Sequence, residues 1–160
     1  MMLDAKRDAA NEPRWRDQGG WETLYSYGES GTIDQIPDSH WQFLSDCRPY
    51  HETDGYLFFH ANYRWNSATS DQPASLLRWR SIEESPPRAH CSGKIAIVGH
   101  SPGPIRDLGF CRCIDTGCGF GGLLTAIDVH HGTCWQVTEA GERINVTDRN
   151  RCISLRQKNE

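Results

Sequence analysis

The sequence predicts a fold of mixed α/β (α+β) class, and three observations support this. Segments typical of helices dominate the first third of the chain, two short apolar runs typical of buried strands lie in its middle, and strand-like segments joined by glycine-bearing turns follow. A length of 160 residues, 37% of them hydrophobic, suffices for one modest core but hardly for two. We therefore expect residues 1–160 to form one domain or part of one.

Four segments are expected to be helical. Residues 1–10 and 22–27 contain helix-forming residues, and Gly28 ends the second segment. A helix over residues 37–47 is predicted because proline is favoured in the first turn and the apolar residues recur with a period near 3.6. Residues 73–82 also begin with a proline, and a pair of prolines follows them.

Two apolar runs are each followed by a histidine. Residues 55–59 have the sequence GYLFF and precede His60, and residues 94–99 have the sequence KIAIVG and precede His100. Continuous apolar runs of this kind, bounded by turn residues, predict buried strands. Further strands are expected at about residues 110–114, 123–129, 134–137 and 151–155.

The position of the two histidines makes them candidates for ligand binding. Loops that follow buried strands are the usual place for binding and catalytic groups in α/β proteins, and neutral imidazole is the commonest metal ligand. Each histidine taken alone is more often a structural residue. Two histidines also cannot complete a catalytic metal site, which normally needs at least three protein ligands.

Composition and charge exclude several classes of function. The 17 Lys and Arg against 21 Asp and Glu give a formal net charge of −4, so there is no basic field for binding nucleic acid. The longest apolar runs are far shorter than the roughly 20 residues that cross a bilayer, and the N-terminal residues have no apolar stretch of signal-peptide length. We expect a cytoplasmic protein that binds neither nucleic acid nor membranes.

Seven cysteines, an odd number at irregular spacing, indicate reduced thiols. Cys111, Cys113 and Cys118 lie closest together, and they leave open a zinc-stabilised structural domain. Free cysteines are more often buried in cores, and the alternate positions Cys111 and Cys113 would share one face of a strand.

The chain also contains, in this order, the segments GGWETLYSYG, YLFFHANYRWN, LLRWR, IAIVGHSP and CIDTGCGFGGLLTAIDV. Together they resemble the C-terminal portion of the metallo-dependent phosphoesterases of the phosphoprotein phosphatase type, including bacterial serine/threonine protein phosphatases. VGHSP resembles the family's GHTP motif with Ser101 for threonine, and YLFFHANY resembles its strand-His-Ala motif, with Asn62 where glycine or aspartate is common. The resemblance implies a partial metallophosphoesterase fold, a β-sandwich flanked by helices that lacks the strands of the N-terminal motifs.

The resemblance implies roles for four residues. His60 and His100 would bind a divalent metal ion (manganese, iron or zinc), and Arg80 in LLRWR would bind the phosphate of a phosphoester substrate such as a phosphoprotein. Asp115 would orient a metal ligand, with capping of a turn as the alternative. We expect the two histidines to lie side by side, and Arg80 rather than Arg78 to point toward their pocket.

Three motifs of the family, GDxHG, GDxxDRG and GNHE, are not in the sequence. In the family they supply the other ligands of a dinuclear metal site, at which a metal-activated hydroxide attacks phosphorus. The chain is therefore expected to begin just after the third motif of a longer enzyme, and to be poorly stable and inactive alone. A noncatalytic remnant or binding module of the same fold is the alternative.

Overall fold

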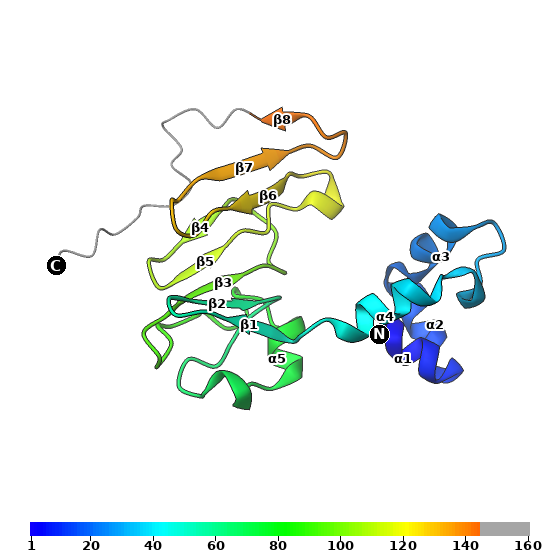
Figure 1. The fold of residues 1–160 in the computed structure, drawn as a ribbon, viewed down its shortest axis with the longest axis horizontal. Helices are drawn as coiled ribbons and strands as arrows, with labels where there is room; N and C mark the ends of the chain where they lie inside the picture. The colour runs from blue at the N-terminus through cyan, green and yellow to red at the C-terminus, as the bar shows by residue number, and fades with distance from the viewer. Residues whose placement is uncertain (145–160) are drawn as a thin grey trace. The chain divides into compact units, whose positions relative to one another are not determined.

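The computed structural model describes residues 1–144, and the chain divides into two compact units. The first unit is Met1–Arg48 and the second begins at Pro49. Helices and strands occur together, which confirms the α+β class (Figure 1). That residues 1–160 belong to one domain stays a prediction. Within residues 1–144, no helix combines the length and the apolar character needed to cross a membrane.

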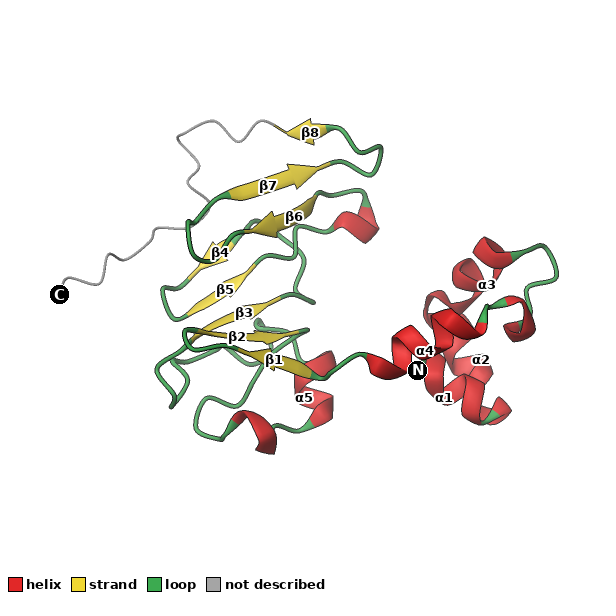
Figure 2. Cartoon of the chain, viewed as in Figure 1, coloured by secondary structure: helices red, strands yellow, loops and turns green. Residues whose placement is uncertain are grey.

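The first unit is helical (Figure 2). It contains α1 (Met2–Arg7), α2 (Glu12–Trp15), α3 (Trp21–Tyr27) and α4 (Asp38–Asp46), joined by short turns. Helices this short are stable only through packing, and the side chains that pack together are Ala5, Trp15, Leu24, Ile36 and Trp41.

The helices predicted at residues 1–10, 22–27 and 37–47 are present, with shifted ends. The first ends early because Asp8 takes an extended conformation, and its carboxylate accepts a hydrogen bond from the backbone N–H of Ala10 at 2.9 Å. An aspartate at this position stabilises the start of the next turn rather than the end of the previous one.

The second unit is built on a five-stranded sheet with the order β1-β2-β3-β5-β4 (Figure 1). Its strands, in that order, are β1 (Tyr50–Glu52), β2 (Tyr56–Phe59), β3 (Ile95–Val98), β5 (Cys111–Cys113) and β4 (Arg106–Asp107). β2, β3 and β5 are parallel to one another, and β1 and β4 run antiparallel at the two edges. The residues that follow β2, β3 and β5 therefore all leave the sheet on the same side, at the carboxyl ends of these three strands.

Alternate residues of the three parallel strands face the core of this unit. Leu57, Ala96 and Cys111 are partners in the register of β2, β3 and β5, and all three are almost completely buried. α5 (Ala74–Trp79) adds Leu77 to the same cluster. α5 confirms a helix within residues 73–82, but it ends three residues early.

The two cysteines of β5 pack in this core. Cys111 and Cys113 are each 1% exposed, as alternate positions on one strand face allow, and burial raises the pKa of the Cys111 thiol to about 12. Cys118 lies elsewhere, beside the cavity described below. In the part of the chain that is described, these thiols belong to no group of three or more side chains that could hold a metal ion.

A second sheet is antiparallel and contains β6 (Leu124–Ile127), β7 (Cys134–Val137) and β8 (Arg143–Ile144). β6 and β7 confirm the strands predicted at residues 123–129 and 134–137. The strand predicted at residues 151–155 lies outside the described residues. A partial metallophosphoesterase sandwich is a finer statement than the α+β class, and it belongs to the proposal below.

The turn between β6 and β7 carries two exposed histidines, as expected. The Asp128 carboxylate accepts hydrogen bonds from the backbone N–H groups of His130 at 2.9 Å and His131 at 3.1 Å, and it contacts Nδ1 of His131 at 2.6 Å. These hydrogen bonds, the His131 side chain first, lower the pKa of Asp128 to about 2. Hydrogen bonding within the turn accounts for this cluster.

Candidate functional site

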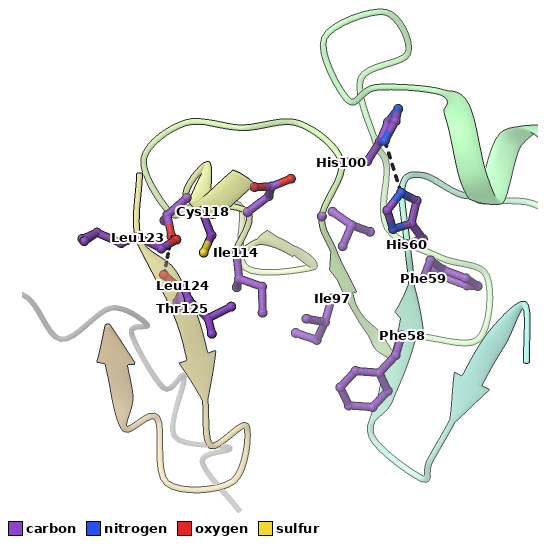
Figure 3. A pocket seen from close by; sticks show the side chains of 14 residues that line it. Phe58, Phe59, His60, Ile97, His100, Ile114, Cys118, Leu123, Leu124 and Thr125 are labelled. Atoms are coloured by element: carbon purple, nitrogen blue, oxygen red, sulfur yellow. Dashed lines mark hydrogen bonds between the residues drawn. The ribbon is translucent and has the colours of Figure 1, made fainter. Parts of the chain in front are cut away.

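Three residues predicted from the sequence come together at the carboxyl ends of the parallel strands. His60 follows β2, His100 follows β3 by two residues, and Asp115 follows β5 by two residues. All three line one cavity of about 400 Å³, with Cys118 and Thr125 (Figure 3). Binding sites of α/β proteins usually form at this edge of the sheet, so we take this cavity as the candidate site.

The two imidazoles point toward one another at one side of the cavity (Figure 3). Nε2 of His60 lies 3.2 Å from Nδ1 of His100, and the ring centroids are 5.0 Å apart. At this distance one ring nitrogen donates a hydrogen bond to the other. The prediction that the two side chains lie side by side is confirmed.

The backbone next to the histidines is closely packed. The N–H of Gly99 donates to the carbonyl oxygen of His60 at 2.9 Å, and a Cβ at position 99 would lie only 3.2 Å from that oxygen. Glycine is therefore the residue that lets β3 approach the end of β2 so closely. The Gly-His pair at positions 99 and 100 brings the two imidazoles within contact distance.

His100 has a backbone conformation that is unusual for a residue with a side chain. Its φ is +61°, the only positive φ among the non-glycine residues of the described chain. This left-handed conformation costs about 1 kcal/mol or more for an L-residue, and such strain is typically retained where it places a functional group. Sequence reasoning placed His100 at a strand end but missed this strain.

Ser101 holds the loop that carries His100. Its side chain is 2% exposed, and its Oγ accepts a hydrogen bond from the backbone N–H of Ile82 at 3.0 Å. Its carbonyl oxygen accepts a hydrogen bond from Nη2 of Arg106, which also pairs with Glu83. Ser101 thus fastens the histidine loop to the segment after α5, a role that the sequence alone did not reveal.

The surroundings of His60 lower the pKa of its imidazole. Burial is the largest cause, followed by the charge of His100, and the charge of Arg78 acts in the same direction. Asp115 acts in the opposite direction and raises the pKa. A lowered pKa keeps His60 neutral, which is the form that can bind a metal ion.

The side chains of Arg78 in α5 and of Arg80, the residue after α5, are oriented differently from the expectation. Arg80 lines a different cavity, where its Nη1 lies 3.7 Å from Oε2 of Glu84, while Arg78 is the arginine whose charge acts on His60. The expected orientation is wrong because α5 ends at Trp79 and Arg80 is extended, with φ −88° and ψ 116°. A side chain on extended backbone does not follow the helical spacing on which the prediction relied.

Asp115 caps a turn, which was the alternative expected for it. Its Oδ1 accepts a hydrogen bond from the backbone N–H of Gly117 at 3.0 Å, and Gly117 has a φ of +76°. The carbonyl oxygen of Asp115 accepts from Gly103 at 3.1 Å. Aspartate commonly stabilises turns in this way. That Asp115 also orients a metal ligand stays a prediction.

The histidine pair fits two positions of a metal site, but not a complete one. Two nitrogens that each bind one ion at about 2.1 Å, at an angle of about 90° to 110°, lie about 3.0 to 3.4 Å apart. The 3.2 Å between His60 and His100 falls in this range. Within residues 1–144, however, no three His, Cys, Asp or Glu side chains are arranged to hold an ion.

Comparison of the chain with protein-family models, with curated proteins and with solved structures found no significant match.

Proposed function

We propose that this chain is the C-terminal portion of a metal-dependent phosphoesterase of the phosphoprotein phosphatase type, with His60 and His100 as two ligands of a divalent ion. The observation that carries the proposal is the 3.2 Å separation of Nε2 of His60 and Nδ1 of His100, at the carboxyl ends of adjacent parallel strands. The order of the sequence segments that resemble this family supports the same function.

The residues of the chain would have distinct parts in this function. The lowered pKa of His60 and the fixed loop of His100 would present the two imidazoles to manganese, iron or zinc. When bound, such an ion polarises a phosphoryl oxygen and lowers the pKa of a bound water. Arg78 is the arginine whose charge acts on His60.

Metal binding by the isolated chain tests the first half of the proposal. Proton NMR would follow the imidazole signals during titration with Mn²⁺, whose unpaired electrons broaden nearby resonances. We expect the signals of His60 and His100 to broaden first, and His60→Ala or His100→Ala to abolish this preference. His51→Ala, on the exposed face of β1, is the matched control. Uniform broadening of all imidazoles would contradict the proposal.

Activity tests the second half. We expect the DNA upstream of Met1 to encode, in frame, GDxHG, GDxxDRG and GNHE, and the extended polypeptide to hydrolyse a phosphoester with added manganese. The 160-residue chain should not do so. An in-frame stop codon directly upstream would instead favour the noncatalytic binding module.

A further inference from the structure

A second cavity, of about 450 Å³, lies beside α5 in the same unit. Its wall has an apolar side, made by Pro73, Leu76 and Trp79, and a polar side with Arg64, Arg80 and Glu84. This volume falls within the range of about 300 to 1,000 Å³ that small-molecule sites occupy. None of these residues lines the first cavity, the one that His60 and His100 line.

The charges on the polar side favour an anion. The guanidinium of Arg64 pairs with no carboxylate in the described part of the chain. Arg80 has one ionic partner, Glu84, at the long distance of 3.7 Å and with both side chains about half exposed. Two guanidinium groups against one carboxylate leave a net positive charge, and guanidinium N–H groups match the oxygens of a phosphate.

Hydrogen bonds from the side-chain amides of Gln72 and Asn62 hold the backbone near the two arginines in place. Gln72 donates from Nε2 to the carbonyl oxygen of Arg64 at 2.8 Å, and its Oε1 accepts from the N–H of Arg64 at 2.6 Å. Asn62, 1% exposed, donates to the carbonyl oxygen of Ser81, the residue after Arg80, at 3.1 Å. A site whose backbone is fixed before binding loses less entropy when a ligand binds.

Trp79 provides an aromatic surface on the apolar side. Its indole is 52% exposed although it lines the cavity. A half-exposed tryptophan that shares a cavity with two arginines is a combination that can stack a planar ring and neutralise its anionic substituent. An inorganic ion alone would leave this apolar side unused.

We propose that this cavity binds a small ligand in which a phosphate is joined to a planar aromatic group, that is, an aryl or nucleoside phosphate. Arg64 and Arg80 bind the phosphate, and Trp79 packs against the ring. Trp79 also contacts His100 edge to face, with ring centroids 6.1 Å apart. The Trp79 side chain would therefore lie between the bound ligand and His100.

Binding is measured by calorimetry in buffer with a chelator and no divalent metal, so that the result does not depend on the proposed phosphoesterase function. The probes are AMP, phenyl phosphate, adenosine and inorganic phosphate. We expect AMP or phenyl phosphate to bind at least tenfold more tightly than adenosine or inorganic phosphate, and the tighter of the two identifies the source of the ring. Equal affinity for inorganic phosphate, or for a phosphoserine peptide, would overturn the proposal.

Variants separate the two sides of the cavity. Arg64→Ala and Arg80→Ala should each weaken binding of the tighter probe about tenfold, while Arg14→Ala, which removes an exposed arginine of α2, should leave it unchanged. Trp79→Ala should reduce the affinity to that of inorganic phosphate, and Trp79→Phe should restore part of it. Glu84→Gln should tighten binding, because it removes the one carboxylate of the wall. Unchanged affinity in both arginine variants would refute the site.

Discussion

The guanidinium of Arg112 on β5 is buried against the carboxylate of Asp107 on β4, with Nε 3.3 Å from Oδ2. Arg112 is only 3% exposed, and its Nη1 has no hydrogen-bond partner in the described part of the chain. A charge that is buried with one ionic partner and an unpaired nitrogen is held at a cost in solvation. This pair therefore links β4 and β5 through their side chains, in addition to the pairing of their backbones.

Removing the carboxylate should destabilise the second unit strongly. Asp107→Asn keeps an oxygen for the backbone N–H of Gly109, which Oδ1 now accepts at 2.8 Å, but leaves Arg112 as an uncompensated buried charge. We expect a loss of about 3 kcal/mol in the free energy of unfolding, measured by urea denaturation. Arg112→Met removes the buried charge instead and should cost clearly less. A larger loss for Arg112→Met than for Asp107→Asn would contradict this account.

The strain at His100 can be measured apart from the loss of its imidazole. His100→Gly and His100→Ala both remove the ring, but only glycine adopts a φ of +61° without penalty. The glycine variant should therefore be about 1 kcal/mol more stable than the alanine variant. Because glycine lowers stability at ordinary backbone positions, equal or reversed stabilities would show that the backbone at His100 is unstrained.

The proximity of His60 and His100 could be predicted because the two strands that precede them share one strong signal in the sequence. Each strand is a continuous apolar run, which indicates a strand buried on both faces and hence a parallel sheet. Once β2 and β3 are parallel neighbours, the residues after them must leave the sheet at the same edge. The wider family fold does not follow from this signal, since it describes one sheet edge only.

The orientation of the arginines could not be predicted in the same way. No glycine or proline follows Trp79 directly, and the nearest strong helix breakers are Pro86 and Pro87. The helix ends at Trp79 through tertiary contacts instead, among them the hydrogen bond from the N–H of Ala61 to the carbonyl oxygen of Leu77 at 2.8 Å. A contact between residues 16 positions apart leaves no local signal in the sequence.

Asn62 should not tolerate replacement by aspartate. Its Nδ2 donates to the carbonyl oxygens of Ser81 at 3.1 Å and Ser85 at 2.8 Å. Asn62→Asp replaces this donor with a buried carboxylate that faces two carbonyl oxygens, so we expect a loss of about 2 kcal/mol or more. Urea denaturation of this variant and of Asn62→Gly, which only deletes the side chain, provides the check. A free energy of unfolding for Asn62→Asp that is higher than that of Asn62→Gly would contradict these hydrogen bonds of Asn62.

The ion pair between Glu83 and Arg106 should make stability depend on pH in the acid range. The hydrogen bond from Arg106 lowers the pKa of Glu83 from its ordinary value of 4.5 to about 2. Above about pH 4.5 the carboxylate is charged in both the folded and the unfolded chain, so the stabilisation by the pair is fully present. As the pH falls toward about 2, the unfolded chain takes up a proton first, and the stabilisation is lost.

Glu83→Gln removes the carboxylate that titrates. Near neutral pH this variant should unfold at a lower urea concentration than the wild type, and the difference should shrink steadily between about pH 4.5 and about pH 2. The Glu83 side chain is about half exposed, so the difference should be small. Glu139→Gln makes the same change in charge at an exposed residue after β7 and corrects for the altered net charge. A difference between Glu83→Gln and wild type that stays constant down to pH 2 would show that the pair with Arg106 does not stabilise the loop of His100 through the charge of Glu83.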